Sequence, residues 1–184
     1  PLRPLLWIDG WFEFQPLHPK FLAHLWFMSL QPDDLARLRK TRNTLNYPWE
    51  RVQEGYEKNQ GGNEAAWIAY LHGEFPGYPE AILQHNLSQV YRRLAALRAD
   101  RQDPKTYGDY YLQVRNPITV EGLAQLTMGS PLPVYNGGHL MATLRLFDRA
   151  ARRPGLPPEV GALVREIHPD RAVIQLVNLS PIHT

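Results

Sequence analysis

The chain has 184 residues, 43% of them hydrophobic and 21% charged, which is ordinary for a water-soluble globular protein. It has no cysteine, and this excludes disulfides, thiolate nucleophiles and cysteine-ligated metals. The formal charge is only +2, and the basic run at 145–153 is interrupted by Asp148, so nucleic-acid binding is disfavoured. No apolar run reaches the roughly 18–20 residues of a transmembrane helix. Together with the lack of a signal-peptide pattern, this favours a soluble, cytoplasmic protein with no membrane partner.

The first half of the sequence predicts mostly helices. Residues 1–20 are aromatic-rich and interrupted by Pro and Gly, which indicates loop or short extended pieces. Helices are expected at 19–30, at 31–43 with Pro32 at its start, and at 64–72, where Asn63 is the expected cap and Gly73 the stop. The clearest helix is 80–101, because apolar residues recur at the spacing of one helical face. These residues are Leu83, Leu87, Val90, Tyr91, Leu94 and Leu97.

The second half predicts three more helices and one strand. Thr119 is the expected cap of a helix over 120–128 that ends before Gly129. Further helices are expected at 139–151 and at 160–167, with a linker between them. Residues 171–179 read as a strand. Its partner is expected either near residues 5–14 or beyond residue 184. We favour the second alternative, in which the chain, which begins without methionine, is a piece of a larger protein.

These elements predict a mainly α fold of stacked helical hairpins followed by the first strand of a β domain. The corresponding division is a helical domain with aromatic-rich loops at 1–152, a linker and short helix at 153–169, and the strand of a truncated β domain at 170–184.

Three groups of residues are candidates for a site. In the first, Glu64 begins a helix and Trp67 follows three positions later, so a carboxylate and an indole lie on one side and suit a sugar ring. In the second, Asp9 and Glu13 are surrounded by aromatic residues, including Trp7 and Trp11, and burial there would raise a carboxyl pKa. Each group also has a structural reading, as a helix start with a core tryptophan or as an exposed loop.

The third group consists of Glu121, near a helix start, and Tyr135, Asn136 and His139 in a glycine-containing turn. Tyrosine and histidine together supply an acid and a base. The structural reading is a helix–turn–helix in which Asn136 and the glycines only form the turn. The sequence shows no metal-ligand spacing, phosphate loop or dinucleotide motif, so no metal and no cofactor are expected.

The tail AVIQLVNLSP, residues 172–181, resembles the opening strand of the β-sandwich domain that closes many glycoside hydrolases. With helical hairpins before it, the whole resembles an (α/α)-toroid carbohydrate-active enzyme. The resemblance implies a carbohydrate substrate and two carboxylates flanking the glycosidic bond. The catalytic candidates Glu64, Glu121, Asp9 and Glu13 rest on local chemistry alone.

We therefore expect a fragment of a carbohydrate-active enzyme that binds a sugar through aromatic side chains and cleaves it by acid–base chemistry. The alternative is a non-catalytic helical interaction or scaffold domain, whose partner is the remainder of a larger polypeptide or another chain. A sugar site predicts a tryptophan partly exposed in a cleft beside a carboxylate. A scaffold predicts buried tryptophans and scattered carboxylates.

Overall fold

The computed structural model describes residues 5–8, 11–14, 19–42, 48–53, 63–108, 110–131 and 141–181. Its helices are α1 (Pro19–Ser29), α2 (Pro32–Arg39), α3 (Glu64–Leu71), α4 (Tyr78–Ala99), the 3-10 turn η1 (Pro104–Thr106), α5 (Tyr110–Arg115) and α6 (Glu121–Met128). Its strands are β1 (Leu5–Ile8), β2 (Trp11–Phe14), β3 (Phe147–Asp148), β4 (Arg153–Pro154), β5 (Val160–Ile167) and β6 (Ala172–Asn178). Within the described ranges, no helix is both long and apolar enough to span a membrane.

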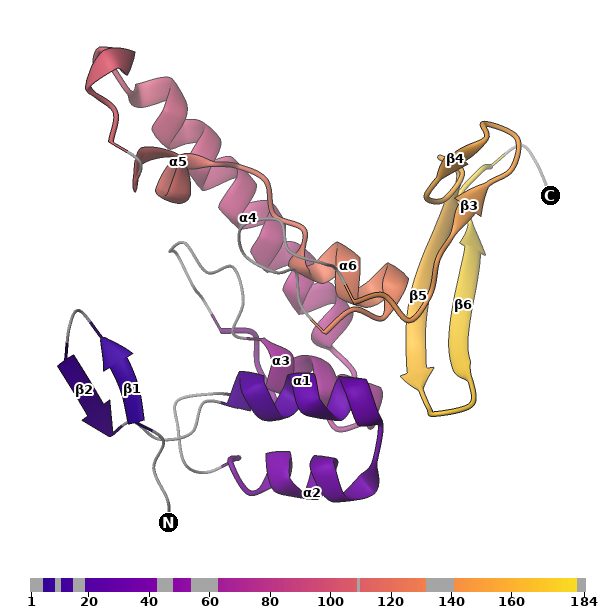
Figure 1. Ribbon diagram of the computed structural model, residues 1–184. Helices are drawn as coiled ribbons and strands as arrows, with labels where there is room; N and C mark the ends of the chain where they lie inside the picture. The colour runs from indigo at the N-terminus through magenta and orange to yellow at the C-terminus, as the bar shows by residue number, and fades with distance from the viewer. Residues whose placement is uncertain are drawn as a thin grey trace.

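The strands correct the predicted fold class. In the described part of the chain they form three two-stranded antiparallel sheets, β1–β2, β3–β4 and β5–β6. The protein is therefore a mixture of helices and small sheets, and the prediction of a mainly α, toroid-like array of hairpins is wrong (Figure 1). Figure 1 shows the β5–β6 hairpin standing beside α6, with α6 between it and α4.

Two predicted helices are absent from the positions expected for them. Residues 160–167 form β5, which pairs along its length with β6, from Val160 opposite Asn178 to Ile167 opposite Ala172. The strand predicted at 171–179 therefore has a local partner, and neither alternative proposed for it was right. Residues 141–146 are irregular, and Phe147–Asp148 form a short strand, so the described part of 139–151 is not helical either.

The core is centred on α3. All eight residues of this helix are buried, from Glu64 to Leu71, and α1, α4 and β5 pack around it. Helix α3 begins after Asn63 and its last turn is followed by Gly73 in a left-handed conformation, as the sequence predicts. Trp26, Tyr78 and Val164 bring the neighbouring elements into the same apolar cluster. The polar backbone groups at the ends of a helix that is buried on every side need hydrogen-bond partners. At the start of α3 the nearest polar side chains are those of Asn63 and Glu64.

Helix α4 has the predicted length and an unexpected orientation. Its buried residues are Tyr78, Ile82, Asn86, Gln89 and Arg93, which are mostly polar. The apolar face recognised in the sequence points the other way, because Leu87 and Tyr91 are 53% and 66% exposed. Periodicity located the helix correctly, yet the polar side of α4 packs on the rest of the protein.

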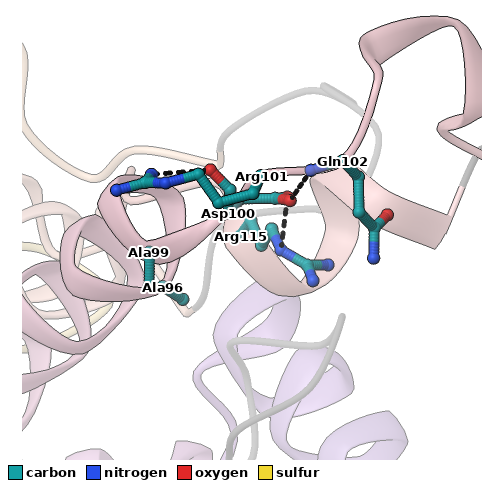
Figure 2. A pocket seen from close by; sticks show the side chains of 6 residues that line it. All are labelled: Ala96, Ala99, Asp100, Arg101, Gln102 and Arg115. Atoms are coloured by element: carbon teal, nitrogen blue, oxygen red, sulfur yellow. Dashed lines mark hydrogen bonds and ion pairs between the residues drawn. The ribbon is translucent and has the colours of Figure 1, made fainter.

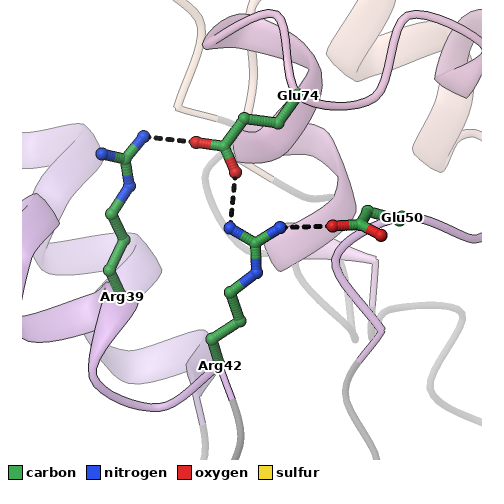
Figure 3. A network of polar contacts seen from close by, with 4 residues as sticks. All are labelled: Arg39, Arg42, Glu50 and Glu74. Carbon is green, nitrogen blue, oxygen red and sulfur yellow. Dashed lines mark hydrogen bonds and ion pairs between the residues drawn. The ribbon is translucent and has the colours of Figure 1, made fainter.

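An arginine–glutamate network holds the first helices together. Glu74, just after α3, accepts from Arg39 at the end of α2 and from Arg42 at 2.8 Å, and Arg42 also binds Glu50 (Figure 3). The Arg42 guanidinium lies 5.3 Å from the centre of the buried Trp49 ring. The end of α2, the segment around Glu50 and the residue after α3 are thereby joined at one point.

Candidate functional site: a buried glutamate pair

Two of the four predicted catalytic residues come together in the core. Glu64 is the first residue of α3 and Glu121 the first residue of α6, and the side chains of both are fully buried. Each carboxyl therefore lies at the positively polarised end of a helix, which favours its charged form. The two glutamates interact electrostatically strongly enough for the charge of Glu64 to raise the pKa of Glu121.

Asn63 positions the Glu121 carboxyl. Its side-chain amide donates to Oε2 of Glu121 at 3.2 Å, and its backbone N–H also donates to this carboxyl. The oxygen of the same amide accepts from the backbone N–H of Gln53 at 2.7 Å. Asn63 was predicted to cap α3 through its side chain, but that side chain links Gln53 to Glu121 instead.

The environment keeps Glu121 protonated at neutral pH. Burial, followed by the charge of Glu64, raises the pKa of Glu121 from 4.5 to about 8, against the opposing effect of the Asn63 hydrogen bonds. Among the described residues, Oε1 of Glu121 has no hydrogen-bond partner. A neutral carboxyl of this kind can donate a proton, and perturbed carboxyls of this kind are typical of acid–base sites.

A tyrosine and a glutamine complete the polar cluster. Tyr78 at the start of α4 is fully buried, and its hydroxyl donates to Oε1 of Gln125 on α6. Gln125 in turn donates to the carbonyl of Pro131 at 3.0 Å. Burial, and then the charges of Glu121 and Glu64, raise the pKa of Tyr78 well above its usual value. Tyr78 is therefore a neutral hydrogen-bond donor at all ordinary pH values.

Helix α6 is placed against α4 by a close backbone approach. Oδ1 of Asn86 accepts from the backbone N–H of Gly122 at 2.9 Å and so satisfies a donor in the first turn of α6. Thr119 was predicted to cap this helix, but the N-cap residue is Val120 and the Thr119 hydroxyl donates to the Asn86 carbonyl at 3.2 Å. Gly129, in a left-handed conformation, ends the helix as predicted.

The predicted aromatic residue of this group, Trp67, lies in the core, three positions after Glu64 on α3. Its ring stacks on Tyr70 with centroids 5.6 Å apart and an interplanar angle of 15°. It is fully buried, so no face of the ring is open to solvent; this is the outcome expected of a scaffold domain, and not the partly exposed ring expected of a sugar site. Three predicted residues, Glu64, Trp67 and Glu121, thus share one region of the core.

The other predicted residues are not brought to this pair by the described structure. Glu13, Trp7 and Trp11 belong to the β1–β2 hairpin, where Glu13 is opposite Leu6, Trp7 opposite Phe12 and Trp11 opposite Ile8; only the backbone is described there. Asp9, Tyr135, Asn136 and His139 lie outside the described residues.

Four residues of the cluster were not recognised from the sequence: Asn63 as a hydrogen-bond donor to Glu121, and Tyr78, Asn86 and Gln125. The available signal was the run of positions 82, 86, 89 and 93 at helical spacing, which carries three polar residues and marks the inner face of α4. No group of three or more potential metal ligands occurs among the residues that the structure describes.

A second polar cluster lies at the other end of α4. A pocket of about 480 Å³ is lined by Ala96, Ala99, Asp100, Arg101, Gln102 and Arg115 (Figure 2). Asp100 pairs with Nε of Arg115 at 3.5 Å, and the hydroxyl of Tyr111 is the main reason why the pKa of Asp100 lies below its usual value. The Arg115 guanidinium lies 4.4 Å from the centre of the Tyr111 ring. These contacts connect α4 to α5 and account for the cluster structurally.

Comparison with protein families gives one relevant match. Residues 2–124 match the family model described as a domain of unknown function, DUF8034. The chain belongs to this family. The matched region includes Glu64, Glu121 and most of the residues that position them, and it ends within α6, so the DUF8034 match does not extend to β3–β6. Searches of curated proteins and of solved structures give no match.

Proposed function

We propose that Glu64 and Glu121 form the acid–base pair of an enzyme that cleaves glycosidic bonds. The observation that carries this proposal is that two carboxyls from distant parts of the sequence meet at two helix starts, where Glu121 has a pKa of about 8. Enzymes that hydrolyse glycosides use a protonated carboxyl with a raised pKa next to an ionised one. The aromatic-rich sequence, with five tryptophans and nine tyrosines, supports a sugar as the substrate.

In the proposed reaction, Glu121 donates its proton to the glycosidic oxygen as the bond to the anomeric carbon breaks. Glu64, as the carboxylate, stabilises the positive charge that develops on the sugar. Water adds its hydroxyl to the anomeric carbon, and its remaining proton returns to the pair. Asn63 holds the Glu121 carboxyl in place from two donors, which fixes the direction of proton transfer.

Substrate access requires a change from the observed state. Both carboxyls and Trp67 are fully covered, so the contact between the starts of α3 and α6 has to open for a sugar to reach them. On opening, the same movement would uncover the indole of Trp67 next to both carboxyls. A carbohydrate that binds should therefore change the fluorescence of this tryptophan.

The test uses Glu121→Gln and Glu64→Gln, with Glu159→Gln at an exposed position before β5 as the matched control. Release of reducing ends is measured over a panel of oligosaccharides and aryl glycosides, and binding is followed by tryptophan fluorescence with Trp67→Phe as the reference. We expect turnover by the parent chain and by Glu159→Gln, and a loss of at least about a hundredfold in both pair variants. Unchanged turnover in Glu121→Gln, or neither turnover nor carbohydrate binding by the parent chain, would reject the proposal.

The second candidate is a non-catalytic interaction domain. It is favoured by the burial of Trp26, Trp49 and Trp67 and by the exposed apolar face of α4. In that case the glutamate pair only positions α3 and α6, and Glu121→Gln changes stability without removing any activity.

A further inference from the structure

The outer face of α4 carries a regular seam. Six of its residues follow one another at alternating intervals of four and three: Glu80, Gln84, Leu87, Tyr91, Leu94 and Arg98. This is the spacing of the contact positions in a coiled coil. The seam lies on the side of α4 opposite Ile82, Gln89 and Arg93, which are buried against the rest of the protein. It runs along about 27 Å of helix, at 1.5 Å per residue.

Five of the six seam residues are exposed, and the sixth, Leu94, is half-buried. Leu87 is 53% and Tyr91 66% exposed, and Glu80, Gln84 and Arg98 are exposed as well. Figure 1 shows α4 extending away from α1–α3, with α5 along only one side of it. A leucine and a tyrosine at the centre of such a seam are the residue types that bury area at helix–helix interfaces.

The residues along the seam match those of a second copy that runs in the opposite direction. Consider two antiparallel copies of α4 that pack through their seams, with the two-fold axis at the height of residue 89 along the helix. Glu80 of one copy is then opposite Arg98 of the other. Gln84 is then opposite Leu94, and Leu87 is opposite Tyr91. Both ends of the pair thus bring opposite charges together, whereas a parallel pair would place like charges opposite each other.

The flanks of the seam fit the same arrangement. On one side lie the small residues Ala81, Ser88 and Ala95, which let two helix backbones approach closely. On the other side lie Leu83, Val90 and Leu97, of which Leu83 is 40% exposed. In an antiparallel pair each flank meets its own copy, so the small side packs on the small side and the apolar side on the apolar side.

We propose that the outer face of α4 is a self-association surface, on which a second copy of this chain packs antiparallel through the seam Glu80–Arg98. The inference does not depend on the glutamate pair or on catalysis. One helix pair buries less than a standard interface, so we expect a weak dimer that forms between about 1 μM and 1 mM chain.

Sedimentation velocity over this range tests the association. Leu87→Lys should weaken the dimer by at least about tenfold, because it places a charge at the centre of the apolar contact. Leu25→Lys on α1 is the matched control, since Leu25 is also a surface leucine in a helix, 41% exposed, and it should leave the dimer unchanged. A chain that stays monomeric over the whole range, as it would if the seam bound a different polypeptide, overturns the proposal. So does a dimer that Leu25→Lys weakens and Leu87→Lys does not.

Charge reversal tests the orientation. Glu80→Arg and Arg98→Glu should each weaken the dimer severalfold, and the double variant should restore it, because the opposite charges meet again. In a parallel dimer the single reversals would only exchange one like-charge pair for another. Single reversals that have no effect, or a double variant that is not restored, reject the antiparallel arrangement.

Disulfide trapping provides an independent test, because the chain has no cysteine of its own. A mixture of Gln84→Cys and Leu94→Cys chains should form a cross-linked dimer on mild oxidation. Neither variant should do so alone, because residue 84 and its copy would be about 15 Å apart along the helices, beyond disulfide reach. Cross-linking of Gln84→Cys alone would show a parallel pair and reject the proposal.

Discussion

Oδ1 of Asn86 on α4 lies 2.9 Å from the backbone nitrogen of Gly122 in the first turn of α6 and accepts its hydrogen bond. The approach is possible because residue 122 has no side chain. A Cβ there would lie 2.8 Å from the same oxygen and 3.1 Å from Ile82. This contact determines where α6 begins on α4, and hence where Glu121 lies.

Gly122→Ala should therefore destabilise the protein. The added methyl group forces Asn86 or Ile82 to move, and overpacking of this kind costs about 1–3 kcal/mol. Gly108→Ala is the matched control, because a Cβ at Gly108 meets nothing within 4 Å. Urea denaturation of both variants gives the comparison, and equal midpoints for the two would show that the close approach is not significant for stability.

Glu121→Gln should change the dependence of stability on pH. The folded protein holds the Glu121 proton up to a pKa of about 8, whereas the unfolded chain releases it near 4.5. The unfolded state therefore loses its proton first as pH rises. The free energy of unfolding falls between about pH 4.5 and 8, by a few kcal/mol at most, and is level on either side. Glu121→Gln removes this fall.

The measurement is a series of urea denaturations from pH 4.5 to 9. Glu159→Gln should keep the slope of the parent chain, because Glu159 is exposed and lies outside the buried pair. Glu64→Gln should move the loss of stability to lower pH, because the charge of Glu64 contributes to the raised pKa of Glu121. If the free energy of unfolding had the same pH dependence in the parent chain and in Glu121→Gln, the raised pKa of Glu121 would be contradicted.

Tyr78→Phe and Tyr70→Phe should differ, although both tyrosines belong to the same aromatic cluster. The Tyr78 hydroxyl donates to Gln125, so its removal leaves a buried acceptor unpaired and costs about 1–3 kcal/mol. The hydroxyl of Tyr70 is buried and has no hydrogen-bond partner within the described ranges, so its removal should be neutral or stabilising. Thermal unfolding of the two variants measures the difference. A larger loss of stability in Tyr70→Phe than in Tyr78→Phe would refute this prediction.

Glu74→Gln should weaken the attachment of the C-terminal end of α2 to the segment after α3, since Glu74 is bound by both Arg39 and Arg42. We expect a loss of about 1 kcal/mol that shrinks in high salt. Glu50→Gln is the comparison, because Glu50 binds only Arg42 in the described structure and its side chain is 68% exposed. Glu50→Gln should lose almost no stability. Urea denaturation at low and at high salt measures the stability of both variants.

Local signals in the sequence located several elements correctly. Pro32, Gly73 and Gly129 mark helix ends by backbone chemistry, and the structure confirms all three. The start of α3 after Asn63 was also located correctly and that of α6 was placed one residue too early, and these expected helix starts are why Glu64 and Glu121 were singled out. That the two residues come together depends on tertiary packing between distant parts of the chain, which no local sequence pattern indicates.

The errors arose where a local pattern fits two structures. Val160, Leu163, Val164 and Ile167 have the spacing of a helical face, yet a segment of only eight residues with a short apolar run at 160–164 suits a strand equally well. Pairing with β6 decides for the strand. Residues 141–146 are fixed by contacts with the end of α6, where the Met128 carbonyl accepts from Thr143 and Leu144, and this overrides their helical composition.

In α4 the periodicity identified a helix without showing which side is buried. Asn86 and Arg93 are inside because each has a backbone partner there, Gly122 for one and the Asn116 carbonyl for the other. Such partners cannot be recognised in the sequence of α4 itself.

The complete burial of α3 has a consequence for the order of folding. An eight-residue helix is far too short to persist in water by itself, since isolated helices need roughly 12–15 residues even to be marginal. Helix α3 can therefore form only once α1, α4 and β5 have supplied its surroundings, although it lies at the centre of the finished molecule. Substitutions such as Ala66→Gly should consequently accelerate unfolding and leave the refolding rate almost unchanged.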